Sequence, residues 1–288
     1  MRLFQKSINK QHGVALIVVL LIVAFVSMIA TDITGRLQLE LRRSANILDK
    51  QQARYYALGA EKLAITILQE DIKRSPDRDD LGQAWATKDL YFHVEGGDLT
   101  GKIKDANRCF NLNSLVTDSK ELGFVVDTEG IAYQSYQRLL SLLNLPIGLS
   151  DSLSDWIDSD VQLISMDGAE DLDYEVLRPA YRAANNLLTD VSELRLIKGY
   201  TSEIVKKMRP YVCALPEAGY FKLNINTIDN DKPELLSMMF KDLSLGAAAR
   251  VLADRKQSGY DDLASFWQQD VLAGQDVDGK AKAKKLGN

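Results

Sequence analysis

An uncharged run of apolar and small residues, Val14 to Ala30, stands close to the start of the chain. Residues 1–13 before it contain three arginines or lysines and no acid, and Asp32 is the first ionised residue after it. The seventeen residues of the run are at the short end of what spans a bilayer as a helix. The preceding positive charges would keep the start of this helix on the cytoplasmic side. The pattern therefore predicts a membrane-inserted helix near the N-terminus.

The helical pattern continues beyond this run, to about Ile72. Residues 31–72 contain no proline and only two glycines, apolar residues recur at helical spacing, and charged residues fill the other face. Ser75-Pro76 ends the pattern. We therefore predict a single helix over residues 14–72, about 90 Å long at 1.5 Å per residue.

The N-terminus is open to three interpretations. A signal peptide cleaved after Ala30 would place Met28 at the −3 position, where a small residue is needed. An uncleaved membrane anchor needs no cleavage site. A prepilin-type leader is cleaved before the apolar run, and Gly13 followed by Val14 resembles the site that prepilin peptidases recognise. Only the third interpretation requires the long amphipathic continuation of the helix, so it is favoured.

Short alternating runs of apolar and polar residues predict strands at residues 91–94, 99–105, 107–113 and 220–226. The sequence from Ser114 to Pro210 is mostly helical in period. We therefore predict an α+β fold, in which a large helical domain is inserted into a pilin-like antiparallel sheet. The expected segments are a leader (1–13), the long helix (14–72), a first β part (73–113), the helical insertion (114–211) and a second β part with a helical segment (212–288).

Composition and motifs argue against catalysis. The chain has 288 residues, a formal net charge of −5, and only two histidines. No GxSxG, HExxH or cysteine–histidine signature is present. Gly96 to Lys102 has the spacing of a phosphate loop, but Ile103 stands where a hydroxyl would hold Mg²⁺. We expect no enzyme activity.

Two helical segments resemble helix-hairpin-helix modules, which grip DNA phosphates in other proteins. They lie at residues 188–211 and 224–266. The net negative charge would repel nucleic acid, so we interpret the motif as packing geometry and expect no nucleic-acid partner. A periplasmic DNA-binding protein is the alternative.

Local sequences along the chain, taken in their order and spacing, are similar to those of one family of secretion proteins. They are Asp155–Asp160, Gly168–Asp171 with Tyr174, Tyr181–Asn186 with Ser192–Arg195, and Leu223–Thr227. Together with the leader, they extend the resemblance over nearly the whole chain. On these grounds the chain is identified as a member of the minor pseudopilin K family of type II secretion systems (the general secretion pathway protein K family).

The resemblance implies a non-enzymatic subunit at the tip of a pseudopilus, which initiates or caps assembly for the export of folded proteins across the outer membrane. It implies a single-pass anchor in the inner membrane and a globular part in the periplasm. Processing between Gly13 and Val14 by the prepilin peptidase, with methylation of the new N-terminus, is expected. The expected partners are minor pseudopilins I and J in a tip complex, and the other pseudopilins. A plain membrane-anchored periplasmic domain is the simpler alternative.

One departure from ordinary pilins fits the tip role. Most pilins carry Glu at the fifth residue of the mature chain, where it faces the N-terminal amine of a neighbouring subunit. The fifth mature residue here is Val18. A carboxylate without a partner is costly in hydrocarbon, so its absence fits a subunit with no neighbour above it.

The C-terminus departs from the family pattern. Members usually close with one or two strands, whereas Lys282–Asn288 reads as the approach to a strand that this sequence lacks. Because an unpaired sheet edge is a liability, we expect that the sequence is truncated here.

Nine acids and no base occur between Asp151 and Glu175. They form either a solvated acidic face or a site for Ca²⁺, which takes six to eight oxygen ligands. The EF-hand pattern is absent, because Gln162 and Leu163 occupy its third-ligand and glycine positions. The resemblance favours a structural Ca²⁺ ion, since members of the family bind calcium in their helical domain. The expected ligands are Asp158, Asp160, Glu170 and Asp171.

The two cysteines, Cys109 and Cys213, flank the predicted insertion. In a periplasmic domain they are free to oxidise. A disulfide between them would close a loop of about 100 residues and stabilise the fold by several kcal/mol. Two buried free thiols are the alternative, and we favour the disulfide.

Overall fold

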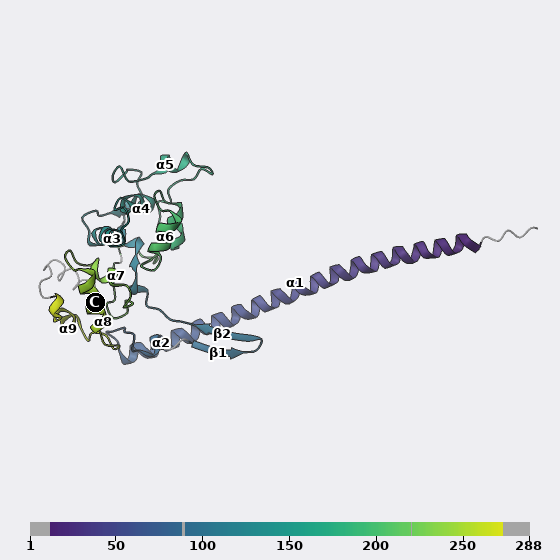
Figure 1. The fold of residues 1–288 in the computed structure, drawn as a ribbon, viewed down its shortest axis with the longest axis horizontal. Helices are drawn as coiled ribbons and strands as arrows, with labels where there is room; N and C mark the ends of the chain where they lie inside the picture. Colours follow the sequence, from purple (N-terminus) through teal and green to yellow (C-terminus); the bar gives the residue numbers. More distant parts are fainter. Residues whose placement is uncertain (1–11, 88–89, 220, 273–288) are drawn as a thin grey trace, which may run out of the picture. The chain divides into compact units, whose positions relative to one another are not determined.

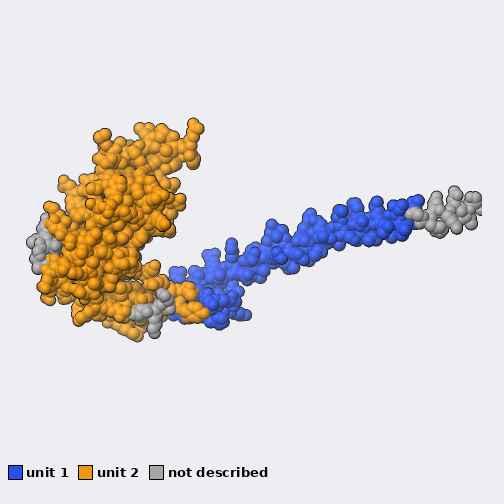
Figure 2. Space-filling model, in the orientation of Figure 1, with its two compact units in different colours: residues 1–65, 92–99 blue, residues 66–91, 100–288 orange. Residues whose placement is uncertain are grey.

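The structure is a computed structural model of the chain, and it describes residues 12–87, 90–219 and 221–272. Residues 1–11 and 273–288 lie outside the described residues, and with them most of the predicted leader and the predicted C-terminal truncation. The chain forms two compact units, coloured separately in Figure 2. Unit 1 consists of residues 1–65 and 92–99, and unit 2 consists of residues 66–91 and 100–288.

The predicted long helix is confirmed. Helix α1 runs over His12–Arg74, two residues beyond the predicted helix at each end (Figure 1). Lys73 and Arg74 in its last turn stabilise this end of the helix, because their positive charges lie at the negative end of the helix dipole. Side chains from Val14 to Ile29 are exposed, and by length and composition α1 can cross a membrane.

A hairpin lies beside α1 in unit 1. Strand β1 (Leu90–Val94) pairs with β2 (Gly97–Gly101) across the two-residue turn Glu95-Gly96. Gly96 has a φ of +90°, which glycine adopts without a steric penalty. The carbonyl of Glu95 accepts hydrogen bonds from Gln52 Nε2 at 3.0 Å and from the Tyr56 hydroxyl at 3.2 Å. These bonds attach the hairpin turn to the side of α1.

Unit 2 contains short strands and a larger set of helices. Strands β3 (Phe110–Asn111) and β6 (Val212–Cys213) pair in parallel, while β4 (Val116–Ser119) and β5 (Gly123–Val126) pair antiparallel. The helices are α2 (Ala84–Thr87), α3 (Ile131–Leu142), α4 (Leu149–Ile157), α5 (Asp171–Glu175), α6 (Ser202–Met208), α7 (Pro233–Ser237), α8 (Leu245–Asp254) and α9 (Leu263–Trp267), with 3-10 turns η1 (Ala106–Arg108), η2 (Leu112–Leu115), η3 (Val191–Leu196) and η4 (Asp270–Leu272).

The mixed helix and strand content confirms the predicted fold class, but three of the predicted strands are shorter or absent. The strand predicted over residues 99–105 is β2, which ends at Gly101. Residues 221–226 are irregular or form a turn. The Asn224 side chain accepts a hydrogen bond from the Asn226 backbone N–H at 3.0 Å, and Asn226 Oδ1 accepts one from the Tyr260 N–H at 2.8 Å. Asparagine side chains that bond to the backbone in this way compete with strand pairing.

The run at residues 107–113 is broken for the same reason. Asp105 caps η1 through the N–H of Asn107, and Asn111 caps η2 through the N–H of Asn113. Only β3 remains extended between these two 3-10 turns. The β4–β5 hairpin, in contrast, lies in a region for which the sequence predicted mostly helix.

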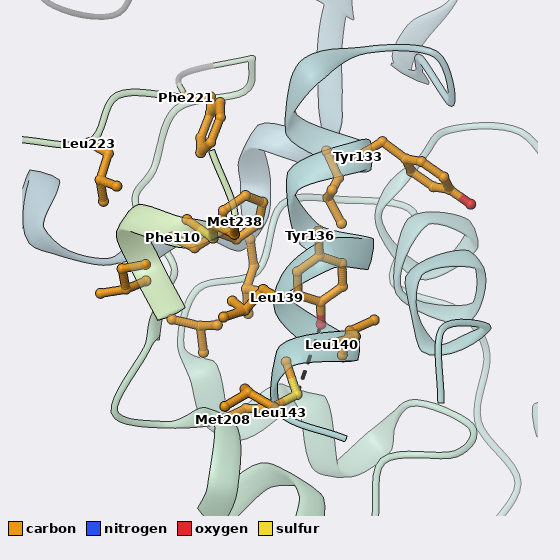
Figure 3. Close-up of a cluster of buried hydrophobic side chains, with 14 of the residues drawn as sticks. Phe110, Tyr133, Tyr136, Leu139, Leu140, Leu143, Met208, Phe221, Leu223 and Met238 are labelled. Atoms are coloured by element: carbon orange, nitrogen blue, oxygen red, sulfur yellow. Dashed lines mark hydrogen bonds between the residues drawn. The ribbon is translucent and has the colours of Figure 1, made fainter. Parts of the chain in front are cut away.

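A single hydrophobic core holds unit 2 together (Figure 3). Its centre is the α3 side chain Tyr136, whose ring stacks on Phe110 with centroids 5.2 Å apart. The ring of Phe110 also packs at a tilt against that of Phe221, with centroids 5.2 Å apart. The Tyr136 hydroxyl is 2.7 Å from that of Tyr200, which donates to the Leu149 carbonyl at 2.7 Å. Because Leu149 is the first residue of α4, this chain of bonds fixes α4 against α3.

Candidate metal centre

Helix α4 positions Asp158, the first of the predicted ligands in the sequence. Every residue from Leu149 to Ile157 is buried, so the helix has no freedom to rotate. It ends at Asp158, which is extended and whose N–H donates to the Ser154 carbonyl at 2.9 Å. The chain then loops out and returns at Glu170, directly before α5. The two ends of this loop therefore place acids side by side.

Three of the four predicted ligands meet in this place. Asp158, Asp160 and Glu170 each offer a carboxylate oxygen, and these oxygens all lie within 4.8 Å of one another. Asp158 is 3% exposed and Glu170 is 6% exposed, whereas Asp160 is open to solvent. Like charges packed at this distance in a partly buried place repel strongly unless a cation joins them.

The buried carboxylates are poorly supplied with hydrogen-bond donors. Asp158 Oδ1 accepts no hydrogen bond from the described residues, and the buried oxygens of Glu170 have only the backbone N–H groups at the start of α5 near them. Burial, followed by repulsion from neighbouring acids, raises the pKa of Asp158 to about 8 and that of Glu170 to about 7. A buried charge without compensation is costly, so these three oxygens are suited to ligating a hard cation.

The structure does not bring Asp171 into this group. Its Oδ1 accepts a hydrogen bond from the Ala183 N–H at 3.0 Å, and its Oδ2 lies 3.8 Å from Arg182 Nε. Asp171 thus connects the start of α5 to the irregular segment that contains Arg182 and Ala183.

Asn185 lies beside the cluster and was missed by the sequence reasoning. Its N–H donates to the Trp156 carbonyl at 3.0 Å, and its Nδ2 donates to the Asp160 carbonyl at 3.5 Å. Its Oδ1 is buried without a partner among the described residues, which makes it a further candidate oxygen. Its φ of +43° is a conformation in which asparagine is enriched. In the sequence, only the adjacent asparagines at residues 185–186 hinted at this conformation.

Asp155 organises the loop between Asp158 and Glu170. It is fully buried, and its carboxylate accepts hydrogen bonds from the Ile164 N–H at 3.1 Å and the Ala169 N–H at 2.9 Å. Burial raises its pKa to about 6. A Cβ on Gly168 would lie 2.1 Å from Asp155 Oδ2, so only glycine allows this approach. Asp155 and Gly168 therefore set the path by which the chain returns to Glu170.

Replacing Gly168 by alanine is expected to displace the Asp155 carboxylate and loosen this return. We expect unit 2 to lose about 2 kcal/mol of stability and calcium affinity to fall about tenfold. Thermal unfolding and calcium titration of the full chain measure both. Gly246→Ala is the control, since a Cβ there meets nothing within 4 Å. An unchanged calcium affinity in Gly168→Ala would contradict the role given to this loop.

The raised pKa values also predict the pH dependence of the metal-free protein. Unfolded Asp and Glu titrate near pH 4, whereas folded Asp158 and Glu170 titrate at about 8 and about 7. Between these values the folded state binds more protons than the unfolded state, so stability falls as pH rises. In a chelator we therefore expect a lower melting temperature at about pH 8 than at about pH 5. Asp158→Asn should flatten this slope, and a flat profile in the unmodified chain would contradict the prediction.

The two cysteines flank the predicted insertion in the sequence, and the structure brings them together. Cys109 and Cys213 form a disulfide with Cα atoms 5.8 Å apart. The bond stands beside the β3–β6 pairing, in which Phe110 faces Val212 and Asn111 faces Cys213. At the other end of the chain, Gly13 lies in α1, and Val14 and Val18 are exposed on it.

Comparison with known proteins places the chain in one family. The sequence profile described as "Type II secretion system (T2SS), protein K" matches residues 108–217, and a second profile of the same description matches residues 223–287. The type II secretion system protein K of Aeromonas hydrophila is 39% identical over 270 residues, covering 91% of this chain and 81% of the relative. That of Klebsiella pneumoniae is 36% identical, covering 92% and 81%.

A solved structure agrees with the sequence matches. A chain in the crystal structure of the GspK-GspI-GspJ complex from the enterotoxigenic Escherichia coli type 2 secretion system superposes with a TM-score of 0.75 at 31% identity. The match covers 85% of this chain and 84% of that one. Neither the DNA-binding alternative nor the plain membrane anchor is supported by these matches. The chain belongs to the type II secretion system protein K family, the minor pseudopilin family that its sequence resembles.

Proposed function

We propose that this chain works as the tip subunit of a type II secretion pseudopilus, bound to minor pseudopilins I and J, and that it is not an enzyme. The observation that carries the proposal is the likeness to a chain of the GspK-GspI-GspJ complex, which extends over 85% of the sequence. At 31% identity with a TM-score of 0.75, the likeness extends over most of the chain, so it supports the same kind of assembly here.

Two features support an inner-membrane anchor with the globular part in the periplasm. The basic residues before Val14 favour a cytoplasmic start for α1, so the chain that follows the apolar run is on the other side. The disulfide between Cys109 and Cys213 persists in an oxidising compartment and not in the cytoplasm.

Assembly begins with removal of residues 1–13 by the prepilin peptidase, which leaves Val14 as the first residue. The apolar half of α1 then packs with the helices of the partner pseudopilins in the membrane. Val18, in the fifth mature position, offers no carboxylate to the N-terminal amine of a neighbour. Such a subunit starts or caps a fibre and does not extend it.

The role of the metal centre is structural: it stabilises the helical part of unit 2. Asp158, Asp160 and Glu170 would hold a Ca²⁺ ion, with Asn185 as a further oxygen donor. The ion supplies neutralisation of buried carboxylates that otherwise repel one another. By joining the end of α4 to the start of α5, the ligands would close the loop that carries residues 159–169.

Processing and complex formation are tested together on the full chain. The chain is produced with pseudopilins I and J, in cells with and without the prepilin peptidase, and extracted in detergent. We expect an intact mass that corresponds to a start at Val14 only when the peptidase is present, and copurification of all three subunits in equal amounts. A start at Met1 in both cells, or near Thr31, would contradict the pseudopilin assignment. Correct processing without copurification would contradict the tip complex alone.

A further inference from the structure

Large apolar side chains are concentrated on the surface of one short stretch of unit 2, residues 161–177. Among the described residues of unit 2, this stretch carries six of the eleven exposed large apolar side chains. They are Val161 (66% exposed), Leu163 (52%), Met166 (98%), Leu172 (79%), Val176 (78%) and Leu177 (44%). Helix α5, at the end of unit 2 away from α8 and α9 (Figure 1), carries Leu172, and Val176 caps its C-terminus. We call residues 161–177 the apolar segment.

The exposed face of α5 is held in place from below. Tyr174 is 1% exposed, and its ring stacks on that of Tyr181 with centroids 5.3 Å apart and meets Trp156 edge-on at 5.1 Å. Leu172 in α5 and Val176, which caps its C-terminus in a helical conformation, are four residues apart and lie on one side of the helix. The buried aromatic contacts hold the helix in place. The two apolar side chains are therefore exposed in an ordered part of the fold and not at a frayed helix end.

A salt bridge and a hydrogen bond hold the segment from the side. Lys198 Nζ donates to the Asp173 carboxylate at 2.9 Å and to the Gly168 carbonyl at 3.1 Å. The loop and α5 are thus joined through one lysine. A surface that is already ordered loses little conformational entropy when a partner binds.

The surroundings of the apolar segment are acidic. Residues 158–177 contain seven acids and no base. Asp173 is paired with Lys198 and Glu175 with Arg182, at 2.9 Å and 2.7 Å. Asp158 and Glu170 are buried, so Asp160 and Asp167 are the exposed acids that remain outside these pairs, and Arg178 follows the segment. An anionic lipid surface would be repelled by the segment, and so would a second copy of this chain, whose net charge is −5.

We propose that the apolar segment is a docking surface for a protein that presents apolar side chains flanked by lysines or arginines. Exposed apolar clusters that polar residues surround mark interaction sites, and the excess of acids here selects a basic partner. The buried Tyr174 platform gives the partner a fixed face of Leu172 and Val176 to cover. This role goes beyond assembly of the tip and does not depend on it.

The surface is tested with the full chain in nanodiscs of phosphatidylcholine. The probe is a fluorescent amphipathic peptide of leucine and lysine, compared with a matched peptide of leucine and glutamate, and anisotropy reports binding. We expect the lysine peptide to bind, and the double substitution Leu172→Asp and Val176→Asp to weaken it by at least about tenfold. Both side chains are exposed, so the variant should keep the melting temperature of the unmodified chain. Leu122→Asp is the matched control, since Leu122 is 70% exposed in the β4–β5 turn, and it should bind normally.

Equal binding of the lysine peptide to the double variant would overturn the proposal. Equal binding of the glutamate peptide to the unmodified chain would overturn the choice of a basic partner. Flotation with anionic vesicles, or self-association that the double substitution abolishes, would assign the surface to a lipid or to a second copy and would equally overturn it. Because Val14 processing and copurification with pseudopilins I and J are measured separately, a failure here leaves the assembly role intact.

Discussion

Removing calcium is expected to lower the melting temperature of unit 2 by about 10 °C. Calcium that binds the folded state at 100 to 1,000 times its dissociation constant stabilises it by about 3–4 kcal/mol. For a unit of this size, each kcal/mol shifts the melting temperature by about 2–4 °C. The cause is the repulsion among Asp158, Asp160 and Glu170, whose oxygens lie within 4.8 Å of one another. Thermal unfolding of the full chain in detergent, with calcium or with a chelator, measures the shift.

Neutral isosteres separate a metal site from a solvated acidic face. Asp158→Asn removes a charge that is buried and partly unpartnered. We expect it to stabilise the metal-free protein and to abolish the calcium increment. Asp118→Asn, an exposed acid on β4, is the matched control and should change neither quantity. If Asp158→Asn keeps the full calcium increment, the cluster is not the site.

The fourth predicted ligand gives a finer comparison. Asp171 bonds to the Ala183 N–H and lies near Arg182, away from the triad. Asp171→Asn should therefore weaken calcium binding less than Glu170→Gln does, although the two residues are adjacent in the sequence.

The parts of the fold that depend on local pattern could be predicted from the sequence. The apolar run and the amphipathic repeat after it define α1 to within two residues at each end. Pairing between distant segments could not be predicted. The parallel contact between β3 and β6 joins residues about 100 positions apart through two residues on each strand, and so short a run has no periodicity to detect.

Asparagine accounts for much of what sequence reasoning missed. The alternation at residues 220–226 reads as a strand, but Asn224 and Asn226 spend their side chains on backbone groups and bend the chain. Asn185 approaches the acids only because the chain there adopts a positive φ. The bond between Asn226 and Tyr260 joins residues 34 positions apart, which residue spacing does not encode.

Acid content, by comparison, was a useful but coarse guide. Nine acids without a base left a solvated face and a cation site open, and the family resemblance favoured the cation site; three of the four chosen ligands converge. The sequence could not separate Asp155, whose carboxylate is occupied by two backbone N–H groups, from Asp158, whose Oδ1 has no partner.

Replacing both cysteines by serine is expected to destabilise unit 2 by about 4 kcal/mol, which is about 10 °C in melting temperature. The disulfide joins residues separated by 104 positions, so its loss restores a large amount of freedom to the unfolded chain. It also stands beside a parallel pair of two-residue strands, which is too short to hold these segments together alone.

The double substitution Cys109→Ser and Cys213→Ser avoids leaving one reactive thiol. Its melting temperature should equal that of the unmodified chain under reducing conditions, and a reductant should have no effect on the variant. The calcium increment should survive, because the triad is built from residues 158–170 and shares no contact with the cysteines. If the variant melts at the same temperature as the oxidised chain, the disulfide does not stabilise unit 2, and the β3–β6 contact with the core around Phe110 must hold the two ends of the insertion together without it.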